Sequence, residues 1–223
     1  SASTRCQPAS RSCAFSNRNS FASSVFEGVP WRYCKAPHCA IAQMTPSTFC
    51  APMRARQLIA SILMVPPEMG GSGAGAVSYS LALQEIAYAC ASSAVTMSVA
   101  NLSTEPLLKF GTNEQKKKWL TELASASLLG AFALTEPNAG SDPGSMTTTA
   151  VLKKDKYIIN GSKVFITHGQ QADLINLIAR TGPDKGPRGL SAFIVEKGTP
   201  GFKIGTKEDK LGLRASNTVE LIF

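Results

Sequence analysis

The sequence predicts an α+β fold in which a helical part precedes an antiparallel β-sandwich or barrel. Two observations lead to this prediction. Over residues 77–101, apolar residues recur every four positions, which is typical of a helix that packs one face against a core. After Leu129 the hydrophobic period changes to two, and short apolar segments alternate with polar turns without helices between them. The chain therefore divides into residues 1–57, 58–129 and 130–223.

The composition excludes two classes of function. Hydrophobic residues make up 43% of the chain and charged residues 17%, so a wholly disordered chain is excluded. The net charge is +8, but the first 67 residues carry +6 of it, and no stripe of basic and aromatic residues follows. We therefore expect no nucleic-acid partner. No apolar run approaches the ~20 residues needed to cross a bilayer, so no membrane span is expected.

Residues 1–57 differ in composition from the rest. They are rich in Ser, Arg, Cys and Pro, and they lack both helical and strand periodicity. An Arg-rich, acid-poor N-terminus resembles a transit peptide; the alternatives are a disordered extension or a stretch foreign to the natural fold. Cys34, His38 and Cys39 lie close together, but no CxxC pair or second cluster with zinc spacing accompanies them. We therefore expect no metal site.

The helical part contains one long helix and two shorter ones. Residues 77–101 contain a single charged residue, Glu85, so we expect this helix to be mostly buried. Residues 107–110 form a short helix that Gly111 ends. Thr112 and Gln115 then form a capping box that opens the next helix. The inner face of that helix is formed by Trp119, Leu120 and Leu123.

Seven strands are predicted after Leu129. Asn160-Gly161 favours a tight hairpin turn between two of them, and residues 154–156 form another turn. The strands are expected at residues 130–135, 147–153, 157–159, 162–167, 174–180, 190–196 and 218–223.

The segment FALTEPNAGSD, residues 132–142, is the first candidate for a binding loop. Glu136-Pro137 cannot easily continue the strand that ends near Leu134, and Asn138 and Gly140 tolerate left-handed backbone. Such a loop can present N–H groups to a flavin edge or a phosphate. An ordinary turn without a ligand is the alternative.

A second glycine-rich segment invites a dinucleotide-binding interpretation. Gly71, Gly73 and Ala76 fit the pattern G-x-G-x-x-A after an apolar run. That motif requires a strand before it and an acid at the end of a second strand. Pro66-Pro67 interrupts the strand that should precede the motif, and a helix follows where the second strand with its acid should lie. A Rossmann fold is therefore disfavoured.

Several ordered motifs across residues 58–223 resemble the acyl-CoA dehydrogenases. FALTEPNAGSD, YIINGSKVFITHG, LSAFIVEKGTPGF and KEDKLGLRASNTVELIF occur in that order, and VPPEMGGSGAG, ALQEIA and LLKFGTNEQKKKWL precede them. EPNAGSD and SNT favour the short- and branched-chain members of the family. The resemblance covers the family's N-terminal helical domain, in part, and its β middle domain. The C-terminal helical bundle of the family has no counterpart in these 223 residues.

The resemblance implies FAD as cofactor and assigns residues to its site. Leu134 and Thr135 would lie at the pyrimidine edge of the flavin, Ser141 would face both the flavin pyrophosphate and the acyl-CoA, and Thr167 would approach flavin N5. The full set implied for cofactor binding is Phe132, Leu134, Thr135, Gly140, Ser141, Phe165, Ile166 and Thr167. Phe165 stands where the family often has Trp.

The resemblance also implies the reaction and its partners. A carboxylate would remove the α proton of an acyl-CoA while the β hydrogen leaves as hydride. The family's base is a glutamate of the C-terminal bundle, so no catalytic residue is expected before Phe223, and this chain alone is expected to be inactive. The alternative is a non-catalytic flavin- or acyl-CoA-binding module. An electron-transferring flavoprotein would accept the electrons, the full-length enzyme would be a homotetramer, and it would lie in the mitochondrial matrix if eukaryotic or otherwise in the cytoplasm.

Overall fold

The computed structural model describes residues 63–184 and 186–223. All of them belong to one compact unit. The predicted extension, residues 1–57, and the Cys34–His38–Cys39 group lie outside the described residues.

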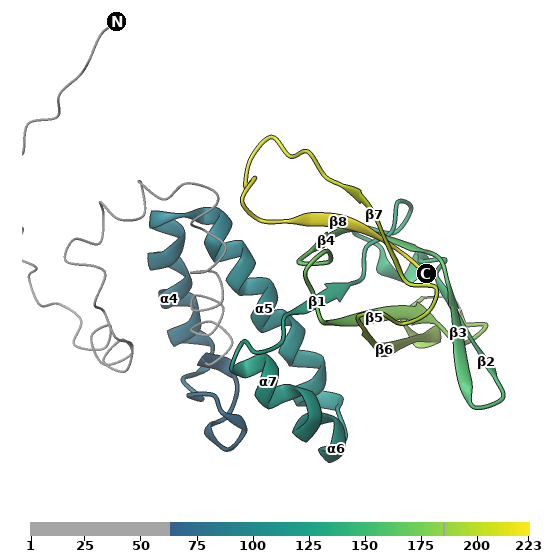
Figure 1. The fold of residues 1–223 in the computed structure, drawn as a ribbon, viewed down its shortest axis with the longest axis horizontal. Helices are drawn as coiled ribbons and strands as arrows, with labels where there is room; N and C mark the ends of the chain where they lie inside the picture. The colour runs from purple at the N-terminus through teal and green to yellow at the C-terminus, as the bar shows by residue number, and fades with distance from the viewer. Residues whose placement is uncertain (1–62, 185) are drawn as a thin grey trace, which may run out of the picture. The chain divides into compact units, whose positions relative to one another are not determined.

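Within residues 63–129 the structure contains a short 3-10 helix, two long helices and one helix in three segments (Figure 1). The elements are η1 (Pro67–Met69), α4 (Gly75–Ala89), α5 (Ala91–Phe110), α6 (Asn113–Gln115), the π-helical η2 (Lys116–Leu120) and α7 (Thr121–Ala124). The capping box is confirmed: Thr112 Oγ1 accepts the Gln115 N–H at 3.2 Å, and Gln115 Oε1 accepts the Thr112 N–H at 2.9 Å. Leu120 and Leu123 are buried with Val65, as predicted for an inner face.

The prediction of one helix over residues 77–101 is wrong. The chain is extended at Cys90, with φ −158° and ψ 103°, and this residue separates α4 from α5. The sequence shows no sign of this break. Its apolar residues recur every four positions on both sides of Cys90, and cysteine is not a strong helix breaker. The predicted short helix at residues 107–110 is the end of α5, which continues through Pro106 and buries Leu107.

Burial in the two long helices also differs from the prediction. No residue of α4 is buried, and Val77 and Tyr88 are 76% and 84% exposed. The buried face belongs to α5 and includes Ala94, Met97 and Ala100. The near absence of charge in residues 77–101 therefore did not indicate burial, since uncharged surface residues are common.

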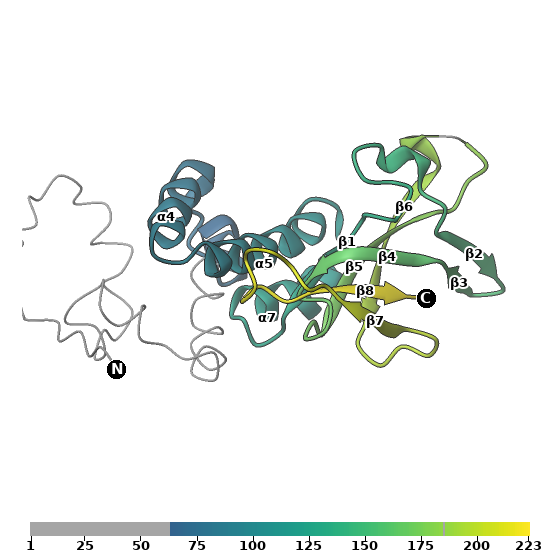
Figure 2. The same ribbon diagram turned by 90° about the horizontal axis from the view of Figure 1, so that it is seen from above.

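The β part contains eight strands within the described residues and forms two sheets. The strands are β1 (Gly130–Ala133), β2 (Thr149–Lys153), β3 (Lys156–Asn160), β4 (Ser162–Thr167), β5 (Leu174–Arg180), β6 (Leu190–Glu196), β7 (Lys203–Lys207) and β8 (Thr218–Ile222). One sheet has the order β1-β5-β2-β3 with β6 on the other edge of β5, and the other has the order β4-β8-β7. Figure 2 shows β4, β8 and β7 together.

The sheets are not purely antiparallel, which corrects the prediction. β1 pairs with β5 in parallel register from Gly130↔Leu174 to Ala133↔Leu177. Parallel pairing joins segments far apart in sequence, so the alternation within each strand does not reveal it. β7 was not predicted, because it contains one large apolar residue, Ile204, and none of its residues is buried.

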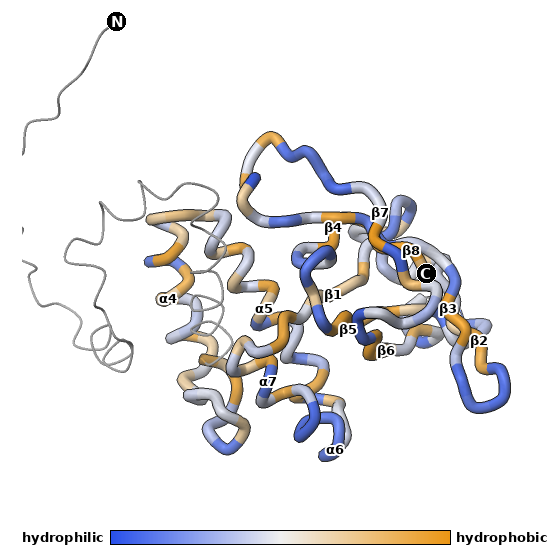
Figure 3. Tube along the Cα trace, viewed as in Figure 1, coloured by the Kyte–Doolittle hydropathy of each residue, from blue (hydrophilic) through white to orange (hydrophobic). Residues whose placement is uncertain are grey.

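The hairpin predicted at Asn160-Gly161 is also wrong. β3 pairs with β2 through the turn at Lys154 and Asp155, and Lys154 has the positive φ (58°) of such turns. The chain then passes from β3 into the second sheet at Gly161, which exchanges two backbone hydrogen bonds with Phe223. The turn between β2 and β3 is hydrophilic, whereas both strands carry apolar side chains (Figure 3).

The core of the β part lies between the two sheets. β1 contributes Ala131 and Ala133, β4 contributes Ile166, and β8 contributes Val219 and Leu221. Ile175 and Leu177 of β5 complete the centre of this cluster. Two faces that share one apolar layer form a sandwich, as predicted. The site described below lies where the end of β1 meets β4.

Candidate functional site

The segment that follows β1 contacts β4 directly. The Val164 N–H donates to the Thr135 carbonyl at 2.9 Å. Thr167 lies three residues further along β4, paired with Thr218 of β8. The structure therefore brings together the two segments that the sequence assigned to one wall, and we call residues 134–135 with residues 165–167 the β1–β4 wall.

A β-bulge shapes β4 at this point. Between Lys163 and Ile166 the register with β8 shifts, so that Lys163 pairs with Leu221 and Ile166 with Val219. Phe165 within the bulge has φ 60°, and its side chain is 62% exposed. A left-handed conformation is strained for a bulky residue, and bulges frequently redirect a side chain beside a functional site. The bulge turns Phe165 outward while it keeps Lys163 and Ile166 inside.

The predicted wall residues differ in accessibility. Ile166 is 2% exposed and its side chain belongs to the sandwich core, so only its backbone is available to a ligand. Thr135 and Thr167 are half-buried. Across residues 63–184 and 186–223, no acceptor is found for the Thr135 N–H and no partner for either threonine hydroxyl. These half-buried polar groups are therefore free to bind an external group.

Phe132 lies in β1, directly opposite Asn176 of β5. It is half-buried, and the alternation of the strand places it on the face opposite to Ala131 and Ala133. The same Asn176 donates through Nδ2 to the Ser103 carbonyl of α5 at 2.7 Å. Phe132 therefore lies on the sheet face that α5 covers.

The loop after the wall is held by its own polar groups. The Asp142 carboxylate accepts the Gly144 N–H at 3.1 Å, and the Ser145 hydroxyl lies within hydrogen-bonding distance of the carbonyls of Asp142 (2.9 Å) and Asn138 (3.3 Å). Gly140 and Ser141 are exposed at its outer side. The chain turns here as predicted, although neither Asn138 nor Gly140 uses a positive φ. The turn is closed instead by paired bonds between Glu136 and Ala139.

A buried ion pair joins the two sides of the wall. Lys163 Nζ lies 2.7 Å from Glu136 Oε1, and the two side chains are 0% and 2% exposed. The remaining acceptor positions of Glu136 take the N–H and hydroxyl of Thr147, at 2.6 and 2.9 Å, and the N–H of Thr148 at 3.0 Å. The sequence did not single out Lys163. The available signal was a lysine at an inward position of a strand, which needs a partner.

Glu136 is ionised at neutral pH. Burial alone would raise the pKa of Glu136, but hydrogen bonds from Lys163 and the two threonines lower that pKa to about 2. Burial lowers the pKa of Lys163, and the hydrogen bond and charge of Glu136 oppose this. A carboxylate held in this way is a poor proton acceptor, so Glu136 is not a candidate general base.

His168 follows the wall and is fully buried. Its Nδ1 lies 3.1 Å from the Gly130 carbonyl, while its Nε2 has no partner among the residues that the structure describes. Burial lowers the pKa of His168, opposed by the hydrogen bond to Gly130. His168 is therefore neutral at pH 7 and packs the start of β1 against the end of β4.

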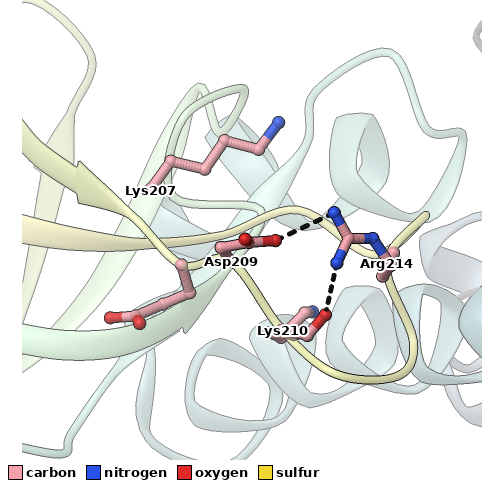
Figure 4. A pocket seen from close by; sticks show the side chains of 5 residues that line it. Lys207, Asp209, Lys210 and Arg214 are labelled. Atoms are coloured by element: carbon pink, nitrogen blue, oxygen red, sulfur yellow. Dashed lines mark hydrogen bonds and ion pairs between the residues drawn. The ribbon is translucent and has the colours of Figure 1, made fainter.

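A polar cleft of about 260 Å³ lies in the loop between β7 and β8. In Figure 4, Arg214 reaches both the Asp209 carboxylate and the Lys210 carbonyl, each at 2.9 Å. Lys210 Nζ donates to Thr218 Oγ1 at 2.7 Å, and Thr218 is the residue paired with Thr167. Through Lys210 the cleft is therefore connected to the strand residue that pairs with Thr167.

Two classes of site are absent from the part of the chain that the structure covers. No group of three or more His, Cys, Asp or Glu side chains there is arranged to hold a metal ion. No helix there has the length and apolar character needed to span a membrane.

Comparison with known proteins identifies the family. Residues 53–127 match the model of the acyl-CoA dehydrogenase N-terminal domain, and residues 131–223 match that of the acyl-CoA dehydrogenase middle domain. An acyl-CoA dehydrogenase of Bacillus subtilis (strain 168) is 56% identical over 160 residues, which are 71% of this chain and 42% of the relative.

Solved structures of related proteins share the fold of this chain. Butyryl-CoA dehydrogenase of Megasphaera elsdenii is 42% identical with a TM-score of 0.74, covering 78% of this chain and 47% of that one. PigA, solved with FAD and proline, is 32% identical with a TM-score of 0.73, covering 80% and 49%. The chain thus spans less than half the length of these proteins. From the two domain matches and the shared fold, the chain belongs to the acyl-CoA dehydrogenase family.

Proposed function

We propose that this chain forms the flavin- and acyl-CoA-binding part of an FAD-dependent acyl-CoA dehydrogenase that acts on short-chain substrates. The single observation that carries the proposal is the β1–β4 wall, where the N–H of the half-buried Thr135 and the hydroxyls of Thr135 and Thr167 have no partner among the described residues, beside the outward Phe165. Butyryl-CoA dehydrogenase and the FAD-bound PigA share the fold and support the substrate class and the cofactor.

The wall suits one edge and one face of a flavin ring. The Thr135 N–H and hydroxyl would donate to the acceptor edge, the Thr167 hydroxyl would lie near the centre of the ring, and the Phe165 ring would cover apolar surface. Ser141, exposed on the adjacent loop, would bind the pyrophosphate or the acyl-CoA. When bound, FAD supplies the acceptor for the hydride that leaves the β carbon of the acyl group.

The base that removes the α proton is proposed to lie in the part of the relatives that this chain does not span. Glu136 is the carboxylate buried behind the wall, and its ion pair with Lys163 excludes it from that role. An electron-transferring flavoprotein as acceptor and a tetrameric full-length enzyme remain predictions from the family resemblance.

Flavin binding to the chain tests the proposal. The purified chain is titrated with FAD while the flavin fluorescence and visible absorption are recorded, and butyryl-CoA is then added. We expect a saturable change with FAD and a second spectral change with butyryl-CoA. Thr135→Val and Thr167→Val should each weaken FAD binding, about tenfold for a lost hydrogen bond in a site shielded from water.

Thr206→Val is the matched control, because Thr206 is an exposed threonine of β7 outside the wall. It should bind FAD like the original chain. A folded chain that causes no change in the flavin signal would overturn the proposal. Equal losses in all three variants would show that the wall is not the binding surface.

A further inference from the structure

Lys163 contacts both residues that flank Thr135. Its Nζ donates to the Leu134 carbonyl at 2.9 Å and to Glu136 Oε1 at 2.7 Å, and Met146 Sδ lies 3.6 Å away. The next residue of β4, Val164, donates its N–H to the carbonyl of Thr135 itself. Every residue from 134 to 136 is therefore bound to one of two adjacent residues of β4.

These contacts fix the direction of the Thr135 N–H. The Leu134 carbonyl and the Thr135 N–H belong to one peptide unit, and this peptide bond is trans, like every other one in the described part of the chain. In a planar trans peptide the two groups point in opposite directions. Since the Leu134 carbonyl points at the buried ammonium, the Thr135 N–H points away from it. A cation on the carbonyl side also polarises the amide and strengthens the N–H as a donor.

Glu136 allows the ammonium to be present at this depth. An unpaired charge in such a buried place would be strongly unfavourable, and the carboxylate compensates it while its own oxygens accept three bonds from Thr147 and Thr148. A buried ion pair is not by itself a good source of stability, because apolar residues of similar volume often replace one without loss. Its specific effect here is geometric, since only a group with several donors can hold the carbonyl and the carboxylate together.

We propose that Lys163 is a positioning residue for the flavin edge: its ammonium, neutralised by Glu136, holds the Leu134–Thr135 peptide so that a polarised N–H faces the ligand. The inference rests on the proposed function and extends it to a residue that has no exposed surface. Because the donor faces the place where reduced flavin accumulates negative charge, Lys163 also raises the reduction potential of the bound cofactor.

The test separates positioning from stability. Lys163→Met alone leaves Glu136 charged and unpaired, and this variant is expected to lose much of its stability. The double variant Lys163→Met/Glu136→Gln removes both charges and keeps similar volumes and an amide oxygen that accepts one of the two threonine N–H groups. We expect it to fold, with a cooperative thermal transition by circular dichroism.

Lys118→Met is the control, because Lys118 forms an ion pair of the same 2.7 Å length with Glu196 on the surface, at 61% and 53% exposure. Three quantities are measured for each folded variant: the FAD dissociation constant, the midpoint potential of the bound flavin, and the Thr135 amide shift in a ¹H–¹⁵N spectrum without flavin. We expect the double variant to bind FAD about tenfold more weakly, as for one charge-assisted hydrogen bond. Its potential should be lower and its Thr135 amide shifted, with all three quantities unchanged in the control.

The outcomes are distinct. If the original chain binds FAD and the folded double variant has the same affinity, potential and amide shift, the ion pair is structural only and the inference fails while the proposed function stands. If the original chain binds no FAD, the proposed function fails and the inference fails with it. An affinity that falls in the double variant despite a restored melting temperature supports positioning.

Discussion

Phe165 and Ile166 are neighbours in β4, yet the first is 62% exposed and the second 2% exposed. Ordinary alternation along the strand separates these two neighbours, and the β-bulge places one extra residue of β4 opposite β8, so that Lys163 and Ile166 are both buried although they lie three positions apart. The left-handed φ of Phe165 is the local consequence. This arrangement gives the wall an aromatic surface without removing Ile166 from the core.

The first prediction concerns the exposed aromatic ring. Phe165→Ala should weaken FAD binding, because the ring is proposed to cover one side of the flavin, while stability changes little at a site with 62% exposure. Phe110→Ala is the control, since Phe110 is 84% exposed at the end of α5. Fluorescence titration with FAD provides the comparison. Equal affinities of the two variants would remove Phe165 from the site.

The second prediction concerns the backbone of the same residue. At φ 60° a residue with a Cβ is strained, whereas glycine adopts this conformation freely. Phe165→Gly should therefore be more stable than Phe165→Ala, by about 1 kcal/mol. Urea unfolding of the two variants measures the difference. If the alanine variant is the more stable one, the bulge does not impose the left-handed conformation.

Much of the β part was predictable because its strands obey local rules. The predictions for residues 162–167, 174–180 and 190–196 coincide with β4, β5 and β6, since an apolar alternation ends there at turn residues. The capping box at Thr112 was also predictable, because it depends on a local pattern of four residues. The Cys90 break was not, because one extended cysteine leaves the helical period intact.

The sequence predicted which segments form the candidate site, but not the orientation and pairing of the side chains within it. The motif around Thr135 and the strand that carries Thr167 were both identified, and the structure brings their segments together. The outward turn of Phe165 depends on the register between β4 and β8, which no local pattern contains. The pairing of Lys163 with Glu136 joins residues 27 positions apart, so it follows from the fold and not from spacing.

The third prediction is acid sensitivity due to Glu136. Its pKa is lowered from 4.5 to about 2 in the folded state, so the folded state binds fewer protons than the unfolded state between these values. The stabilisation is fully present above pH 4.5 and is lost as the pH falls towards 2, with a total on the order of 3 kcal/mol. Chemical denaturation at several pH values should show this decline, whereas the double variant Lys163→Met/Glu136→Gln should show a smaller one. If stability falls with pH equally in the original chain and in the double variant, Glu136 is not the group responsible for the decline.

The fourth prediction concerns the pH dependence of stability that is due to His168. This dependence lies at higher pH than that of the carboxylates. Burial lowers the pKa of His168 below its ordinary value of 6.5, so the unfolded chain takes up a proton before the folded chain does. Its contribution to stability is complete above pH 6.5 and is lost as the pH falls through the folded pKa. The positive φ of His168, 68°, limits the replacements, and asparagine tolerates it best among polar residues without titration.

His168→Asn should therefore be less stable than the original chain at pH 8, since it loses packing at a fully buried site. Its stability should also change less between pH 7 and pH 5, because the group that takes up the proton is gone. Urea unfolding at pH 8, 7, 6 and 5 tests both expectations. His38, the other histidine of the chain, is replaced by asparagine as the control. If His38→Asn rather than His168→Asn removes the pH dependence, His168 is not the titrating group.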